Sequence, residues 1–247
     1  MNLLLFEPAE AAADVIVVRD RRARHIREVL RAVAGARLRA GIVRGPIGAA
    51  EVVAIDDDAV ALRFTPEAEP PAPLPIDLVL AVPRPKVLRR VVQAAAAIGV
   101  RRIDLVNAWR VDKSYFGSAR LAEGSLAEDV RLGAEQGATT WLPAIEIHPR
   151  LMPFLDAHAT ARPARHTLCA HARAGAVELE RAYAPGTRDD AALAIGPEGG
   201  WIERELDSFV ARGWSIVSLG APILRVEAAV VSALAQLALL RRLAGTS

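Results

Sequence analysis

Two short loops in the last quarter of the sequence combine glycines with apolar residues at the ends of predicted strands. They are Ile195–Gly200 (IGPEGG) and Leu219–Leu224 (LGAPIL). Glycines let the backbone approach a ligand closely, so two such loops at adjacent strand ends could enclose a flat, largely uncharged heterocycle. Neither loop has the lysine-containing P-loop or the G-x-G-x-x-G pattern, which disfavours a phosphate-cradling role. Each loop alone is equally compatible with an ordinary connection between a strand and a helix.

Two charged residues follow the second loop, at the start of an apolar helix. Arg225 cannot serve as an ordinary base because its guanidinium is permanently protonated, but it can stabilise a developing anion. Glu227 lies where a carboxylate complements the positive end of a helix dipole, and this alone would account for it. Arg225 could likewise be an ordinary surface residue.

The sequence from residue 76 onward alternates apolar segments with helical patterns. Such alternation predicts an α/β domain with a mostly parallel sheet and helices on both faces. The predicted strands are Ile76–Val82, Arg102–Val106, Leu168–His171, Ala191–Ile195 and Ser215–Ser218. The predicted helices are Val87–Ile98 (ending at Gly99), Leu121–Gln136, Glu203–Arg212 and Val226–Leu243.

The first 70 residues have a different pattern, with short β-rich segments and one helix. The predicted strands are Val15–Val18, Ala50–Ile55 and Ala59–Phe64, the last two joined by a hairpin turn at Asp56–Asp58. Apolar residues from His25 to Val33 recur at helical spacing, and Gly35 is the expected stop. Four prolines in Glu67–Pro75 (EAEPPAPLP) predict a linker. We therefore predict a small β-barrel at residues 1–70 and the α/β domain at residues 76–247.

The basic residues are unevenly distributed along a nearly neutral chain. The formal net charge is +2, and lysine occurs only at Lys86 and Lys113, so almost all of the 31 basic residues are arginine. Nine arginines and only two acidic residues lie between Arg19 and Arg44, which predicts a nucleic-acid contact surface. The excess of arginine and alanine could also simply reflect a GC-rich genome.

Several classes of protein are disfavoured by the composition. The single cysteine, Cys169, cannot form an intrachain disulfide framework and fits a reducing cytoplasm. The N-terminus has no basic region and no long apolar region of the kind found in signal peptides, and the longest apolar run is too interrupted to span a bilayer. We expect no metal site, because no histidine has metal-like spacing with carboxylates among His148, His158, His166 and His171.

IGPEGG followed by LGxxILRxE at the start of an apolar C-terminal helix resembles the SPOUT superfamily, and more narrowly the RsmE-type small-subunit ribosomal RNA (uracil-N3)-methyltransferases. Other segments agree in order along nearly the whole chain. They are His25–Gly35 (HIREVLRAVAG), Lys86 with Ile98–Val100, Arg110–Tyr115 (RVDKSY) and Glu135-Gln136.

The resemblance implies a PUA-like RNA-binding barrel and a SPOUT methyltransferase domain with a C-terminal trefoil knot. It implies that S-adenosyl-L-methionine binds in a bent form to three loops. The expected cofactor-binding residues are Ala170, His171, Ile195, Gly196, Pro197, Glu198, Gly199, Gly200, Leu219, Gly220, Ile223 and Leu224. It also implies a homodimer, which the nearly all-round apolar character of Val226–Leu240 independently favours.

The reaction implied is methylation of N3 of a specific uridine in 16S ribosomal RNA, in the cytoplasm. Arg225 would stabilise the anion formed when the imide proton is lost, and Glu227 would orient Arg225 or loop amides, or act as a general base. Glu198 would shape its loop or contact the substrate. The residues expected to hold the RNA are Arg21, Arg22, His25, Arg27, Arg31, Arg84 and Lys86. The alternatives are methylation of another ribosomal or transfer RNA position, and an RNA-binding relative without catalysis.

The chain departs from the family pattern at four positions. Pro222 replaces a frequent arginine, Ala228 a threonine, Ala97 a glutamate, and Ile202 a helix-capping serine or threonine. Only Glu205 of that capping box remains. These changes affect the expected substrate contacts more than the cofactor loops.

Overall fold

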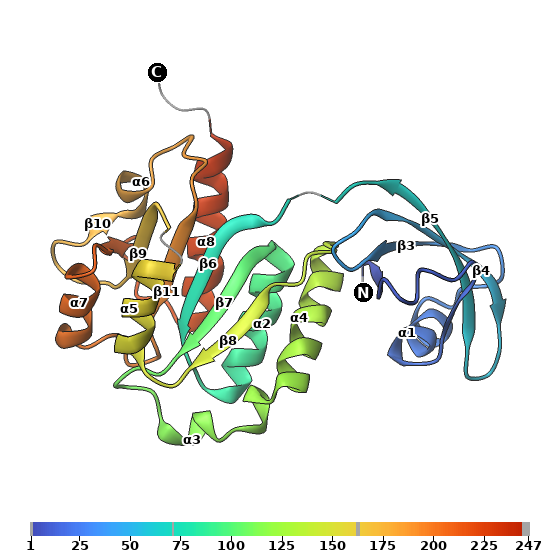
Figure 1. Ribbon diagram of the computed structural model, residues 1–247, viewed down its shortest axis with the longest axis horizontal. Helices are drawn as coiled ribbons and strands as arrows, with labels where there is room; N and C mark the ends of the chain where they lie inside the picture. The colour runs from blue at the N-terminus through green and yellow to red at the C-terminus, as the bar shows by residue number, and fades with distance from the viewer. Residues whose placement is uncertain (1, 71, 162–163, 244–247) are drawn as a thin grey trace. The chain divides into compact units, whose positions relative to one another are not determined.

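The computed structural model describes residues 2–70, 72–161 and 164–243 (Figure 1). Its contacts divide the chain into two compact units. One consists of Met1–Ala72 with Arg131–Leu142, and the other of Pro73–Val130 with Pro143–Ser247.

A parallel sheet forms the centre of the second unit, and every pair of neighbouring strands in it runs in the same direction. The strand order is β10-β12-β9-β11-β6-β7-β8. The bounds are β6 Leu74–Ala81, β7 Val100–Val106, β8 Ala144–His148, β9 His166–Ala170, β10 Val177–Glu178, β11 Ala191–Ile195 and β12 Ser215–Ser218. The predicted parallel α/β fold is therefore confirmed.

β11 lies at the centre of this sheet and is buried along its whole length. Its last residue, Ile195, pairs with Leu80 of β6 on one side and with Ala170 of β9 on the other. Because parallel strands end at the same edge, the loops after β6, β9, β11 and β12 emerge side by side.

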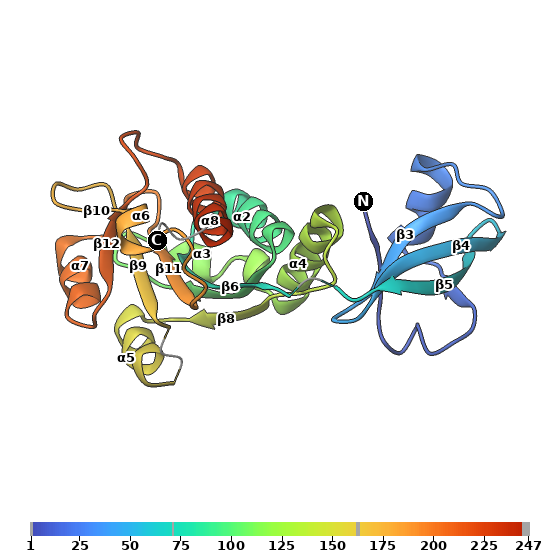
Figure 2. The same ribbon diagram turned by 90° about the horizontal axis from the view of Figure 1, so that it is seen from above.

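Helices cover both faces of this sheet. α2 (Pro85–Ile98) and α8 (Val226–Arg242) pack together on one face, and α5 (Leu151–Ala161) lies on the other (Figure 2). The remaining helices are α3 (Lys113–Phe116), α4 (Glu123–Gly137), α6 (Leu179–Ala182) and α7 (Glu203–Val210). No helix in the described ranges has both the length and the apolar character needed to cross a membrane.

The start, the end and the buried face of α2 follow from its local sequence. Pro85 occupies its first turn, where a missing N–H costs nothing, and Gly99 ends it with a left-handed φ of 86°. Its buried residues recur at helical spacing from Leu88 to Ala96. The predicted helix and its predicted stop at Gly99 are thus confirmed.

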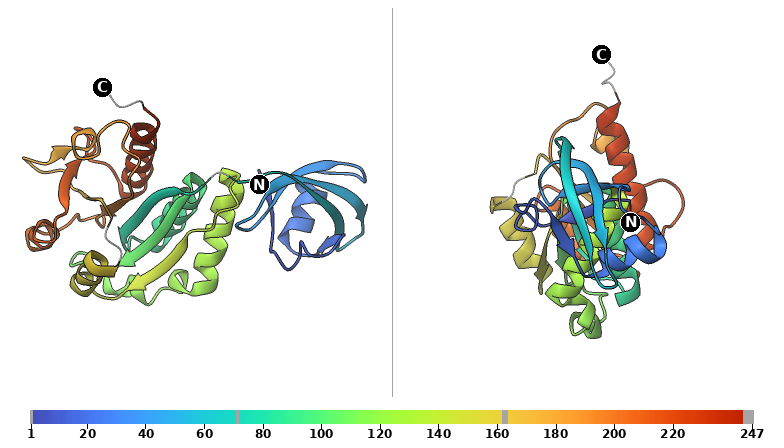
Figure 3. Two further views of the ribbon diagram at one scale, coloured as in Figure 1. Left: turned by 45° about the horizontal axis from the view of Figure 1, so that its top comes forward. Right: turned by 90° about the vertical axis from the view of Figure 1, so that its right-hand side faces the viewer.

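The first unit is a curled, mixed five-stranded sheet of order β1-β3-β4-β5-β2 around α1 (Arg21–Arg24) (Figure 3). The bounds are β1 Leu4–Phe6, β2 Ile16–Val18, β3 Arg37–Ile42, β4 Ile47–Ile55 and β5 Val60–Ala68. β1 is parallel to β3 and the other pairs are antiparallel. The hairpin predicted at Asp56–Asp58 is confirmed, since Asp56 N–H donates to Ala59 O at 2.9 Å.

Two local predictions for these regions are wrong. The helix expected to reach Val33 instead continues from α1 only as one π-helical turn, His25–Val29, and Val33 is 69% exposed. Only Ala23 and Ile26 of this segment belong to the barrel core, and Arg31 then turns the chain with a φ of 49°. The expected linker is also shorter, because Pro75 lies in β6, where the register with β7 is irregular.

The end of α4 belongs to the first unit through both apolar and charged contacts. Leu4 and Phe6 of β1 face the barrel core, whereas Leu3 and Leu5 pack against Ala134. Next to it, the carboxylate of Glu135 is 1% exposed and accepts two hydrogen bonds from the Arg21 guanidinium, at 2.6 and 2.7 Å.

Replacing Arg21 by Ala should lower the free energy of unfolding because it leaves the buried Glu135 carboxylate unpaired. We expect a loss of about 2–3 kcal/mol, below the roughly 3–5 kcal/mol of a fully buried pair because the Arg21 side chain is 26% exposed. Urea titration measures this change. The control is Arg19→Ala, which breaks an exposed pair with Asp58 and should cost less than about 1 kcal/mol. Equal effects of the two variants would contradict the assignment.

Candidate functional site

A cavity of about 720 Å³ opens at the carboxyl edge of the parallel sheet in the second unit. It is bounded by the loops that follow β6, β9, β11 and β12, together with the first turn of α8. All twelve residues predicted to bind the cofactor line it: Ala170, His171, Ile195, Gly196, Pro197, Glu198, Gly199, Gly200, Leu219, Gly220, Ile223 and Leu224. Its volume lies within the roughly 300–1,000 Å³ of small-molecule sites.

The glycines of the Gly196–Gly200 loop are required by close approaches. A Cβ on Gly196 would lie 3.2 Å from the ring of Trp201, which is itself 2% exposed and closely packed. Gly200 has a φ of 69°, and a Cβ there would lie 3.4 Å from the His171 ring. Glycine is therefore favoured at position 196 by the close approach to Trp201 and at position 200 by the left-handed backbone.

Residues from two other strand ends hold this loop in place. Glu198 accepts a hydrogen bond from the backbone N–H of Arg84 at 3.0 Å, and Arg110 donates from Nη1 to Gly199 O. Glu198 therefore makes a contact that shapes its loop, which is one of the two roles expected from the sequence. Arg110, which the sequence indicated only as part of the family resemblance, anchors the loop from the side of β7.

The helix that follows the loop, α7, starts without a capping side chain at Ile202. Glu205 replaces part of that cap, since its Oε2 accepts from Ile202 N–H at 3.0 Å. Its Oε1 accepts from the backbone N–H of Trp109 at 2.8 Å, and the residue is only 4% exposed. One buried carboxylate therefore joins the loops after β7 and β11.

The His171 imidazole is half-buried in the wall of the cavity. Burial lowers its pKa below the ordinary 6.5, with Arg173 and Arg110 acting in the same direction and Glu203 opposing them. His171 is therefore neutral at neutral pH, and it leaves the cavity without a fixed positive charge on that side.

Arg225 and Glu227 both line the mouth of the cavity. Arg225 is the N-cap residue of α8 and is exposed, and Glu227 lies in the first turn. Within the described ranges neither side chain forms a hydrogen bond or ion pair. Glu227 therefore does not contact Arg225 in this structure, although orienting that side chain is one of the roles expected from the sequence. The Arg225 guanidinium is consequently free to meet a ligand.

The comparison that decides the family is with the RNA methyltransferase domain, which matches residues 70–238. The chain belongs to this RNA methyltransferase family. A relative of matching length, the ribosomal RNA small subunit methyltransferase E of Treponema pallidum, is 32% identical over 240 residues, covering 95% of this chain and 90% of the relative. A protein of the same name with the suffix 1 from Borreliella burgdorferi is 26% identical over 151 residues, 61% of each chain.

Solved structures of other proteins have the same fold as this RNA methyltransferase over nearly its whole length. The ribosomal RNA small subunit methyltransferase E of Neisseria gonorrhoeae, bound to S-adenosylmethionine, is 21% identical with a TM-score of 0.75 and 96% coverage of both chains. A methyltransferase of Legionella pneumophila, in complex with the same cofactor, is 22% identical with a TM-score of 0.76 and 96% coverage of both chains.

The residues predicted to hold RNA lie in different environments in this RNA methyltransferase. Arg22 is 7% exposed, and its guanidinium donates to Glu10, Asp20 and Leu5 O, so it stabilises the barrel. The Arg21 guanidinium is ion-paired with the Glu135 carboxylate. Neither guanidinium is available to a phosphate.

The other five residues of this predicted set are at least partly accessible. Burial lowers the pKa of the half-buried His25, and Arg27 donates to Asp56 O at 3.4 Å. Arg31, Arg84 and Lys86 are exposed. Arg84 and Lys86 begin α2, whose first turn contains no acidic residue. Cations are unfavourable at the positive end of a helix dipole, so helix stability does not account for them.

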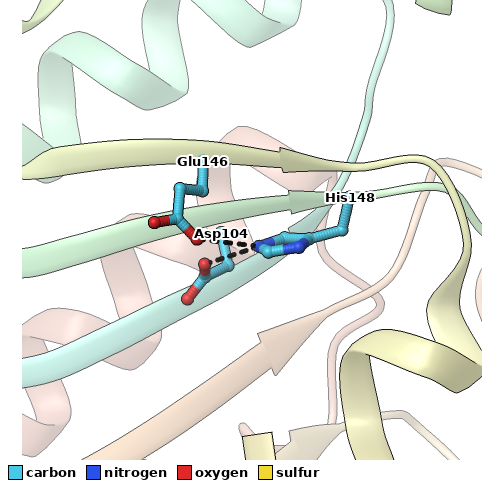
Figure 4. Close-up of side chains that lie close together, drawn as sticks. All are labelled: Asp104, Glu146 and His148. Carbon is cyan, nitrogen blue, oxygen red and sulfur yellow. Dashed lines mark hydrogen bonds and ion pairs between the residues drawn. The ribbon is translucent and has the colours of Figure 1, made fainter. Parts of the chain in front are cut away.

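A second cluster of chemically active residues lies on β7 and β8, away from the residues that line the cavity. Figure 4 shows Asp104, Glu146 and His148 gathered together, with ligand atoms within 4.8 Å of one another. The expectation that no histidine lies at metal-like spacing from carboxylates is therefore wrong for His148, because alternate residues of a strand share one face. Arg102 forms ion pairs with both carboxylates, and His148 Nε2 lies 2.8 Å from Asp104 Oδ1, so the three side chains already have partners and we assign this cluster no ligand.

Replacing Gly200 by Ala should lower the free energy of unfolding by roughly 1–2 kcal/mol, because its left-handed backbone is strained for any residue with a Cβ. The affinity for S-adenosylmethionine should fall as well, since the loop lines the cavity. Denaturant titration and calorimetry measure the two effects. Gly124→Ala is the matched control, because a Cβ there has no atom within 4 Å and should leave both values unchanged or slightly raise stability. A Gly200 variant that behaves like this control would show that the loop is not constrained.

Proposed function

We propose that this chain methylates N3 of a specific uridine in 16S ribosomal RNA, using S-adenosyl-L-methionine. The observation that carries the proposal is the unpaired Arg225 guanidinium at the mouth of a glycine-lined cavity at the sheet edge. The names of the relatives in Treponema pallidum and Neisseria gonorrhoeae support the substrate class, and the cofactor bound in the Neisseria and Legionella structures supports the donor.

The cavity fits such a cofactor by its size and by the chemistry of its walls. The loops at Ala170–His171, Ile195–Gly200 and Leu219–Leu224 supply backbone groups and apolar surface for a flat heterocycle. The carboxylates of Glu198 and Glu227 are the acidic groups of the lining, which suits a cation. When bound, S-adenosylmethionine supplies an electrophilic methyl group on a sulfonium.

Arg225 acts on the nucleotide. N3 of uracil becomes a good nucleophile only after its imide proton is lost, and a guanidinium beside the ring stabilises the negative charge that develops. Glu227, in the first turn of the same helix, is placed to accept a hydrogen bond from the nucleotide or from Arg225 once the site is filled. Because N3 lies on the pairing edge, the uridine enters unpaired or flipped out of a stack.

The RNA is held by positive charge outside the cavity. Arg84 and Lys86 at the start of α2 contact phosphates near the reacting uridine, and His25, Arg27 and Arg31 form a second contact surface on the barrel. The barrel of residues 1–70 serves as the RNA-binding domain and residues 76–247 as the methyltransferase domain, with the chain knotted at its C-terminal end. Such contacts make RNA affinity fall steeply with salt concentration.

The working form is a homodimer in the cytoplasm, acting on the small ribosomal subunit or its RNA. α8 is packed against α2 on one side and still exposes Val231 and Leu239, at 42% and 47%. An apolar helix with a second uncovered side suits a symmetric contact with another copy.

The test of the function is transfer of a labelled methyl group to unmodified small-subunit RNA and to whole subunits, with the methyl located by mass spectrometry after digestion. Arg225→Ala should lower turnover by roughly 100- to 1,000-fold, as expected for loss of one group that stabilises developing charge. Its affinity for S-adenosylmethionine should be unchanged. Arg204→Ala, which removes an exposed arginine of α7 outside the cavity lining, is the control. Methyl on another atom, or full turnover by the Arg225 variant, would refute the assignment.

Affinity for S-adenosylmethionine should depend on pH through His171. The imidazole is neutral above its lowered pKa, so protonation as the pH falls below 6.5 adds a positive charge beside a cationic ligand. Calorimetry between about pH 7.5 and 5.5 should therefore show weakening toward acid. His171→Asn should remove most of this dependence. An affinity that stays constant in the unchanged protein would contradict the proposed position of the sulfonium.

A further inference from the structure

An exposed tryptophan lies on the turn that follows β7. Trp109 is 77% exposed, whereas its neighbours Ala108 and Val111 are each 7% exposed, and Val111 N–H closes the turn onto Ala108 O at 3.0 Å. The indole therefore stands at the tip of a turn whose two ends are buried. Covering an indole of this size with a ligand would contribute a large hydrophobic free energy to binding.

The turn is fixed against the cavity from two directions. The Trp109 backbone N–H donates to the buried carboxylate of Glu205, and Arg110 donates to Gly199 O. A Cβ on Gly199 would lie 3.0 Å from Cδ of Arg110, so the arginine stem lies directly on the loop that lines the cavity. The Trp109 indole is thus carried on a preorganised support beside the site, which reduces the entropic cost of using it for binding.

Basic residues follow the indole along the chain. Arg110, Lys113 and Arg120 are exposed, and the acidic residue between them, Asp112, is occupied in capping α3 through Ser114. A flat aromatic surface among cations is the combination that binds single-stranded nucleic acid, where bases stack on the ring and phosphates meet the cations.

We propose that Trp109 stacks on an unpaired nucleobase of the RNA next to the nucleotide that enters the cavity, with Arg110 contacting the adjoining phosphate. This inference rests on the proposed function for its ligand, an RNA substrate. It adds a binding subsite outside the residues expected from the sequence.

The charge distribution favours RNA over a second copy of the chain at this position. A contact between copies is richest in apolar residues at its centre and poor in charge. Three exposed basic residues, Arg110, Lys113 and Arg120, follow Trp109 in the sequence, whereas the exposed apolar side chains of α8 are Val231 and Leu239.

The test compares Trp109→Ala and Trp109→Phe in the full chain, with Val177→Ala as a control that trims another exposed apolar side chain of the same unit. The probe is an unmodified small-subunit ribosomal RNA transcript, titrated without cofactor. Loss of one stacked base should weaken the Kd of Trp109→Ala by about 5- to 100-fold, and Trp109→Phe should retain most of the affinity. Stacking should also quench indole emission in the unchanged protein, and Trp109→Phe should lose that part of the quenching.

The affinity for S-adenosylmethionine and the oligomeric state should be the same in all variants. RNA affinity of Trp109→Ala equal to that of Val177→Ala would overturn the proposal, as would an unchanged protein that does not bind the transcript. A change in oligomeric state confined to Trp109→Ala would overturn it in favour of a contact between copies. Failure of the proposed function would give a different result from failure of this inference. The protein would then transfer no methyl group, but the RNA titration would still separate Trp109→Ala from its control.

Discussion

The pairing of β11 with β6 on one side and β9 on the other is the constraint on which the rest of the site depends. β11 is buried throughout, so its register is fixed by packing on both faces. That register brings the ends of strands separated by more than 100 residues in sequence to one edge. The glycine loop, His171 and Arg225 become neighbours because of it, and a one-residue slip of β11 would separate them.

A few polar contacts then hold the Gly196–Gly200 loop in position. Glu198 holds the start of α2, Arg110 holds Gly199, and Glu205 holds both its own helix and the Trp109 turn. Every one of these contacts uses a backbone group on at least one side. Each contact therefore fixes the main chain of the loop or of the segment beside it.

The sequence predicted the parts of this protein that are encoded locally. The strand–loop–helix pattern around Gly196–Gly200 and the stop at Gly99 depend on residues close together in the chain, and both predictions were confirmed. The capping role of Glu205 was expected, but its contact with Trp109 and the contact of Arg110 with Gly199 were missed, because these partners lie 96 and 89 residues away. Arg22 was expected on an RNA surface because its charge was evident in the sequence and its burial was not. The edge strand β8 was missed although Ile145 and Ile147 alternate with polar residues, because the segment is only five residues long. The helical spacing from His25 predicted a helix, but it could not show that the helix ends in one π-helical turn.

The double use of Glu205 has a consequence for how the two ligands of such a site would affect each other. Its carboxylate joins the start of α7, directly after the glycine loop, to the turn that carries Trp109. Any ligand that shifts or stiffens the loop must therefore act on the turn as well, and the reverse also holds. Thermodynamic reciprocity then requires each ligand to change the affinity for the other by the same factor. With RNA bound at Trp109 as proposed, this single buried carboxylate would link donor binding to acceptor binding.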